Sequence, residues 1–160
     1  MESPAMANFA KALFYAAAIA TTMTLSGCFG MGSGLFARAA TNERECLMRA
    51  MYFESNRSSE DGMFAVGTVV MNRVGHPGYP RSICGTVGQK NQFAAGVLTR
   101  PLTEPRSVAL TARVADHILA GARHHGVRSA QHFHQAGLRF PYNNMHYVLL
   151  AGGNEFYEKY

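Results

Sequence analysis

Apolar residues recur with helical spacing in the first half of the chain. One face of the first such stretch follows the i, i+3, i+4, i+7 pattern of an amphipathic helix with these residues: Leu47, Ala50, Met51 and Glu54. Asn42 is followed three residues later by Glu45, which is a capping-box pattern, so the helix is predicted to begin at Asn42. A carboxylate therefore lies on the apolar stripe of this helix.

A second helix is predicted directly after the first. Ser58 or Ser59 supplies its N-cap, and Glu60 and Asp61 suit the positive end of the helix dipole in its first turn. Its predicted buried face consists of Phe64, Gly67, Val70, Met71 and Val74. The glycine- and proline-rich residues 75–80 end the helix and form a loop.

Two further helical segments and a loop follow. A short helical turn is predicted over 82–87, and the loop over 88–96 contains Gln92 and Phe93. The third long helix is predicted from Glu104 to Leu119, with Thr103 as its cap and Pro105 in its first position. Gly121 closes it.

The last quarter of the chain reads as strand rather than helix. Residues 131–134 form a short polar and aromatic stretch, 141–144 form a turn, and 147–150 with 155–157 flank Gly152 and Gly153 as a hairpin. The predicted fold class is therefore α+β, mostly helical with a small antiparallel sheet near the C-terminus.

The N-terminus reads as an export signal. Lys11 precedes an apolar run over 12–25, which is shorter than the roughly 20 residues that a membrane-spanning helix needs. The run meets Leu25-Ser26-Gly27-Cys28, which resembles the lipobox of bacterial lipoproteins. The resemblance implies cleavage before Cys28 and acylation of that residue. An ordinary signal peptide or a buried apolar helix is the alternative.

Composition and charge limit the remaining choices. A chain of 160 residues with 48% hydrophobic residues is expected to build one globular domain. Its 15 Lys and Arg against 10 Asp and Glu give a net charge of +5, which suits an acidic partner. The net charge alone does not choose between nucleic acid and an anionic polymer such as cell wall. The basic residues are spread along the chain and the chain carries an export signal, so nucleic acid is not expected as a partner.

The cysteines fit an oxidising compartment. If Cys28 is lipidated, Cys46 and Cys84 remain as an even pair. A disulfide between them would close a loop of about 40 residues and stabilise the fold by about 4 kcal/mol. Two free buried thiols are the alternative.

Glu54 is the strongest candidate for a catalytic residue. An ionised carboxylate on a buried helix face costs several kcal/mol unless it is paired, so its pKa is raised or it binds a partner. A Glu that stays protonated near neutral pH can donate a proton to the leaving oxygen of a glycosidic bond. The pattern alone also allows a surface Glu paired with Arg49 or Arg57.

Several motifs in one order resemble the bacterial cell wall hydrolase family of the spore-cortex-lytic enzyme, the SleB/CwlJ-like hydrolases. The segments that carry the resemblance are Glu45–Ser55, Gly62–Val74, Tyr79–Pro80, Ile83–Val87, Gln92–Phe93, His132–His134 and Gly153–Tyr157. The resemblance implies a lysozyme-like, transglycosylase-type domain over 43–160. The lipobox-like sequence places a signal peptide over 1–27 before it, and the residues rich in Gly, Ser and Ala that follow Cys28 are expected to form a lipidated tether over 28–42.

The resemblance also implies a reaction, the cleavage of peptidoglycan glycan strands between N-acetylmuramic acid and N-acetylglucosamine. The family's catalytic Glu in Tyr-x-Glu-Ala corresponds to Glu54 in Tyr52-Phe53-Glu54-Ser55. The family usually has a second Glu four residues later, where this chain has Ser58. Glu60 and Asp61 are the nearby substitutes. With one well-placed carboxylate we expect a lytic transglycosylase rather than a muramidase-type hydrolase, which normally uses two carboxylates.

Other polar and aromatic residues could hold the sugar. The residues predicted to bind substrate are Tyr52, Asn72, Gln92, Phe93, His132, His134 and Tyr157. Arg73 could orient the acid together with Asn72, although a helix C-terminal Arg also suits the dipole. His132 and His134, with His124 and His125 nearby, supply two zinc ligands at most, so no metal and no cofactor are expected.

Two alternatives from other classes stay open. The chain could bind peptidoglycan without cleaving it, or it could be a cysteine peptidase or amidase with Cys46 or Cys84 as nucleophile and His132 or His134 as base. The expected location is the periplasm with a lipid anchor on Cys28. Phe29, rather than Asp, after the cysteine favours the outer membrane.

Overall fold

The first helix of the computed structural model, which describes residues 32–160 and the side chains from Glu43 onward, is α1 (Gly32–Glu54). It begins before Asn42, so the predicted start of the helix is wrong. Glu45 does not cap a helix end but accepts a hydrogen bond from Arg49 Nε at 2.8 Å, one turn further along α1. The signal peptide, the lipidation of Cys28 and the first residues of the predicted tether lie outside the described residues.

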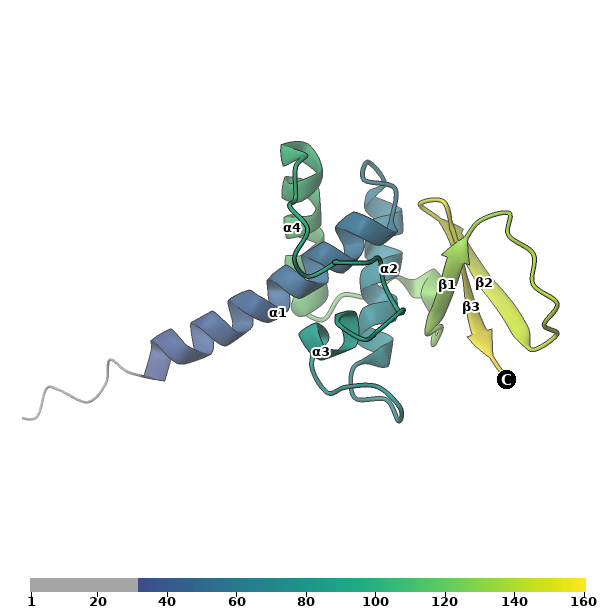
Figure 1. Cartoon of the computed structure of the whole chain (residues 1–160), viewed down its shortest axis with the longest axis horizontal. Helices are drawn as coiled ribbons and strands as arrows, with labels where there is room; N and C mark the ends of the chain where they lie inside the picture. The colour runs from purple at the N-terminus through teal and green to yellow at the C-terminus, as the bar shows by residue number, and fades with distance from the viewer. Residues whose placement is uncertain (1–31) are drawn as a thin grey trace, which may run out of the picture. The chain divides into compact units, whose positions relative to one another are not determined.

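The second helix, α2 (Glu60–Arg73), is the centre of the domain (Figure 1). Ser59 is its N-cap and accepts a hydrogen bond from the Gly62 amide, which decides between the two predicted caps. The helix is buried on more than the predicted stripe, since Met63, Val66 and Val69 are also fully buried. The wider burial follows from its contacts, because α3, α4 and the sheet all pack against it.

Three helical segments complete the helical part. They are α3 (Ile83–Val87), α4 (Pro105–Leu119) and the 3-10 turn η1 (His125–Val127). Pro105 occupies the first position of α4 as predicted, but the N-cap is Glu104, so the prediction of Thr103 is wrong. The amides of Thr103 and Glu104 instead donate to the Tyr52 hydroxyl, both at 3.2 Å. None of the helices in residues 32–160 has the length and apolar character of a membrane span.

The sheet consists of β1 (His132–Gln135), β2 (Met145–Ala151) and β3 (Asn154–Lys159) in the order β1-β3-β2. All pairs are antiparallel, and Gly152 and Gly153, both with positive φ, form the predicted turn between β2 and β3. Phe133 and Phe156 pack against the helical core, with Phe156 fully buried. The predicted α+β fold with a small C-terminal sheet is confirmed.

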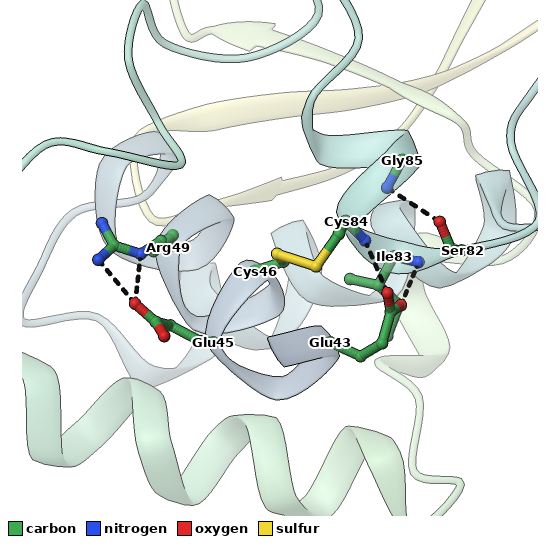
Figure 2. Close-up of a disulfide and its surroundings, with 8 residues drawn as sticks. All are labelled: Glu43, Glu45, Cys46, Arg49, Ser82, Ile83, Cys84 and Gly85. Carbon is green, nitrogen blue, oxygen red and sulfur yellow. Dashed lines mark hydrogen bonds and ion pairs between the residues drawn. A yellow bond between two sulfur atoms is a disulfide. The ribbon is translucent and has the colours of Figure 1, made fainter. Parts of the chain in front are cut away.

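A disulfide joins α1 to α3. Cys46 and Cys84 are bonded, which confirms the predicted pairing and excludes both residues as free thiol nucleophiles (Figure 2). Next to the bond, the Glu43 carboxylate accepts hydrogen bonds from the amides of Ile83 (2.5 Å) and Cys84 (3.4 Å). The first turn of α3 is thus held to α1 by a covalent bond and by a carboxylate that satisfies its free amides.

Candidate active site

A cleft of about 620 Å³ opens where the end of α1 meets the sheet. Its size lies in the range of ligand-binding pockets. The cleft is lined by Glu54, Asn56, Arg73, Gln92, Phe133, His134, Gln135, Gly152, Gly153 and Asn154. The lining therefore combines residues that are far apart in the sequence. They come from α1, α2, the loop over 88–96, β1 and the β2–β3 hairpin.

Glu54 is the last residue of α1 and is held at both its backbone and its side chain. Its carbonyl oxygen accepts a hydrogen bond from Asn154 Nδ2 at 2.6 Å, and its carboxylate accepts one from the Ala94 amide. The side chain is half-buried, and this burial raises the pKa of the Glu54 carboxyl, against the opposing effects of the Ala94 amide and the Arg73 charge. A carboxyl in this setting retains its proton to higher pH than a free Glu and can act as a general acid.

The turn between β2 and β3 is fixed against α2. Gly62 and Gly152 approach so closely that a Cβ on Gly62 would lie 2.5 Å from the Gly152 Cα. The Asn56 amide also donates to the Gly152 carbonyl at 3.1 Å. Only a glycine pair permits this contact, and it places Gly152, Gly153 and Asn154 at the cleft beside Glu54.

Arg73 brings a buried positive charge to the cleft. It is the last residue of α2 and only 4% exposed, and its Nε donates to the Gln131 carbonyl at 2.7 Å. Its guanidinium lies over the rings of Tyr79 (5.4 Å) and Phe93 (5.2 Å). Among the described residues no carboxylate lies within ion-pair distance of it, so its field acts on Glu54 and on whatever the cleft binds.

The structure brings four of the residues named from the sequence together at the cleft: Glu54, Arg73, Gln92 and His134. Phe93 lies one layer behind, between Arg73 and the Phe133 ring at 6.4 Å. Phe133, Gln135 and Asn154 also line the cleft and were not singled out from the sequence. Phe133 and Asn154 lie in segments that carry the family resemblance, but their local pattern does not mark them as cleft residues.

Four other predicted sugar-binding residues lie away from the lining. Tyr52 is buried and accepts hydrogen bonds at the start of α4. Asn72 Nδ2 donates to the carbonyls of Arg128 and Ala130, both at 2.9 Å, and so ties α2 to the segment before β1. His132 stacks on Tyr157 at 5.3 Å, and burial lowers the pKa of His132 to about 4, so its ring is neutral.

The two residues predicted as a possible second carboxylate do not lie at the cleft. Glu60 and Asp61 are exposed in the first turn of α2 and do not line the cleft. Asp61 is bound by His124 Nε2 at 2.9 Å. A further carboxylate, which was not predicted from the sequence, lies beside the cleft residue His134. Glu155 Oε2 is 3.9 Å from His134 Nδ1, and this oxygen is buried and has no hydrogen-bond partner among residues 43–160. Its sequence setting in β3 gives no sign of this position.

Comparison with solved structures gives the fold a precedent. The chain is similar to the crystal structure of the catalytic domain of the SleB protein from Bacillus cereus, with 17% identity, a TM-score of 0.58, and coverage of 74% of this chain and 91% of that one. It is also similar to the catalytic domain of the germination-specific lytic transglycosylase SleB from Bacillus anthracis, with 18% identity, a TM-score of 0.59, and coverage of 73% and 94%.

Comparison by sequence gives the family. No curated protein matches the chain. The sequence model of one family does match, and it covers residues 57–157, which include the second helix, the disulfide partner Cys84 and the whole sheet. The match extends over more than half of the chain, beginning just after Glu54. The chain therefore belongs to the cell wall hydrolase family.

Proposed function

We propose that this protein cleaves the glycan strands of peptidoglycan between N-acetylmuramic acid and N-acetylglucosamine as a lytic transglycosylase, with Glu54 as the single catalytic residue. Membership of the cell wall hydrolase family supports peptidoglycan as the substrate. The observation that carries the mechanism is that Glu54 is the only carboxylate among the described residues lining the cleft, half-buried and with a raised pKa.

One carboxylate is sufficient for the lytic reaction. Glu54 donates its proton to the glycosidic oxygen, and the bond from that oxygen to C1 of the muramic acid breaks. The Glu54 carboxylate then accepts the proton of the muramic acid 6-hydroxyl while the oxygen of that hydroxyl bonds to C1. The product is a 1,6-anhydro ring, Glu54 is protonated again, and no water is consumed.

The local environment suits both halves of this cycle. Burial favours the protonated acid at the start, and the Ala94 amide and the Arg73 charge favour the carboxylate after proton donation. A retaining or inverting hydrolase would need a second carboxylate across the bond, at about 5 Å or about 6.5–9.5 Å from the first. Neither Glu60 nor Asp61 lines the cleft.

Mass spectrometry of the sugar products tests the proposal. Isolated sacculi treated with the purified chain should release anhydro-muropeptides, and Glu54→Gln should lower the rate by about 10²–10⁴-fold, the usual contribution of a general acid. Glu60→Gln and Asp61→Asn are the matched controls and should retain the rate. Reducing ends would refute the lytic reaction in favour of hydrolysis, and equal inactivity of wild type and Glu54→Gln would leave only binding.

The pH dependence gives a second test of Glu54. The group must be protonated to start the cycle, so kcat should fall as the pH rises through its raised pKa. The alkaline limb should therefore lie above the pKa of an ordinary Glu. Because the Arg73 charge lowers the pKa of Glu54, Arg73→Met should move the alkaline limb to higher pH, and a limb that this variant does not move would contradict the influence assigned to the charge.

We also propose that the protein is held in the periplasm, at the outer membrane, by acyl chains on Cys28. The support is the lipobox-like sequence that ends at this residue. Incorporation of labelled palmitate into the wild type and not into Cys28→Ala would be the expected result. Labelling of both proteins would contradict acylation of Cys28.

A further inference from the structure

A group of aromatic rings is exposed next to the cleft. Phe140 and Tyr142 lie in the loop between β1 and β2, and Tyr147 lies on β2, with exposed fractions of 41%, 64% and 46%. This loop projects beyond the sheet on the side away from the helices (Figure 1). Leaving several aromatic rings in water forgoes their burial energy, and a contiguous exposed group of this kind is typical of a binding surface.

The rings are ordered relative to one another. Phe140 and Tyr142 stack nearly parallel, with centroids 6.2 Å apart and planes at 11°. The Tyr147 ring lies 5.6 Å from Tyr157, which is its cross-strand partner on β3. Each of these rings packs against another ring in the structure, and side chains that are already positioned lose less conformational entropy on binding. We call Phe140, Tyr142 and Tyr147 the aromatic shelf.

His134 connects the aromatic shelf to the cleft. It lines the cleft with Glu54, and its Nε2 lies 2.9 Å from the Tyr147 hydroxyl. The Phe140 ring stands edge-on to the His134 ring at 4.8 Å. One side chain therefore forms the wall of the cleft and the inner end of the aromatic shelf, so the two surfaces are continuous.

We propose that the aromatic shelf is a second binding site for the same glycan strand, which stacks its sugar rings on Phe140, Tyr142 and Tyr147 beyond the part of the strand that lies in the cleft. Sugar rings present faces of C–H groups that pack on aromatic faces, while their hydroxyls remain in water. The exposed Arg139 in the same loop adds a positive charge that suits the carboxylates of an anionic wall polymer. This proposal rests on the proposed function for the identity of the strand.

The position of the aromatic shelf predicts dependence on the length of the substrate. In this proposal a tetrasaccharide binds in the cleft, whereas a long strand binds in the cleft and on the aromatic shelf at once. The aromatic shelf should therefore favour long strands and hold the enzyme on them between cuts. The expected signature is a change in the preference for long over short substrates.

Binding is measured first, in the full chain carrying Glu54→Gln so that the strand stays intact. Adding Tyr142→Ala or Phe140→Ala should raise the Kd for purified long glycan strands by about twofold to tenfold per ring, the range expected for one aromatic stacking contact. Tyr142→Phe retains the ring and should retain the affinity. Tyr160→Ala is the matched control, because Tyr160 is 81% exposed and its ring contact is with His146, outside the aromatic shelf.

Cleavage is measured second, in the chain with Glu54 intact. Tyr142→Ala should lower the ratio of kcat/KM for long strands to kcat/KM for the tetrasaccharide by a similar factor, and Tyr160→Ala should not. Circular dichroism melting shows whether each variant is folded. Recovery of the ratio in Tyr142→Phe would show that the ring, and not the fold of the loop, matters.

The outcomes separate the two proposals. Affinities and ratios equal to those of Tyr160→Ala would overturn the aromatic shelf while leaving cleavage by Glu54 untouched. Two other outcomes with unchanged glycan binding would also overturn it. If Tyr142→Ala and Phe140→Ala lost binding to anionic lipid vesicles, the aromatic shelf would be a membrane-binding surface, and if they changed the oligomeric state, it would bind a second copy of the chain. A wild type that cleaves no strand refutes the proposed function, and the binding series then decides on the aromatic shelf alone.

Discussion

Replacing both Cys46 and Cys84 by alanine tests how much of the fold depends on one covalent link. The two residues are 38 positions apart, and the loop between them contains Glu54 and all of α2. Closing a loop of this length lowers the entropy of the unfolded chain, which stabilises the fold by about 4 kcal/mol in the chain-entropy model. Since small domains have about 5–15 kcal/mol in total, the double variant should lose a large part of its stability.

Urea unfolding followed by circular dichroism measures this loss. With an m-value of about 1–3 kcal/mol/M, the midpoint should fall by about 1–4 M. Wild type treated with dithiothreitol should unfold at the same midpoint as the double variant. Cys28→Ala is the matched control, and it should keep the wild-type midpoint.

A midpoint that falls by much less would refute the reasoning. The Glu43 carboxylate also joins α1 to α3, because it accepts hydrogen bonds from the amides of Ile83 and Cys84. If Glu43→Gln lowered the midpoint more than the double variant did, this hydrogen-bonded cap, and not the loop entropy, would be the main link between α1 and α3.

Three further predictions concern the surroundings of the cleft. Gly62→Ala places a Cβ 2.5 Å from the Gly152 Cα, so it should cost about 1–3 kcal/mol in thermal melts and lower kcat, and an unchanged melting temperature would contradict the close contact. Glu54→Gln should be more stable than wild type at neutral pH. Because burial raises the pKa of folded Glu54, the stability contributed by its protonated form is present at low pH and lost as the pH rises through that pKa. The stability advantage of Glu54→Gln over wild type should therefore vanish below about pH 4.5, near the ordinary pKa of a Glu, and an advantage that persists there would refute this linkage. Asn72→Ala removes the donor to two carbonyls and should cost about 1–3 kcal/mol in urea unfolding, whereas a raised KM with unchanged stability would support a contact with the sugar.

Local patterns in the sequence determine much of the framework. Ser59 and Pro105 mark helix starts because capping and proline geometry act within one turn of the chain. Gly152 and Gly153 mark the hairpin because its turn requires positive φ. The helical spacing places Glu54 on a buried stripe, and the even cysteine count predicts the bond between Cys46 and Cys84.

Local sequence patterns give wrong predictions in two situations. A helix can extend beyond the residues that look like its cap, and a polar side chain can bond to a group that is remote in the sequence. The capping box at Asn42 lies inside α1, where Glu45 pairs with Arg49 instead. Asn72 has a side chain of the kind that binds sugars, but its amide donates hydrogen bonds to two carbonyls more than fifty positions later in the chain. Chemical type alone does not tell these two outcomes apart.

Only the tertiary structure decides the composition of the cleft. Asn154 donates a hydrogen bond to the Glu54 carbonyl from 100 positions away. His134 lines the same cleft as Glu54 and comes from β1, which pairs with β3 on the edge opposite β2. The helical period places Glu54 on a partly buried stripe, and the resemblance to the cell wall hydrolases makes it the candidate acid. The sequence does not identify all the residues that line the cleft beside Glu54, because their positions depend on how the sheet packs against α2, and no short-range pattern encodes that packing.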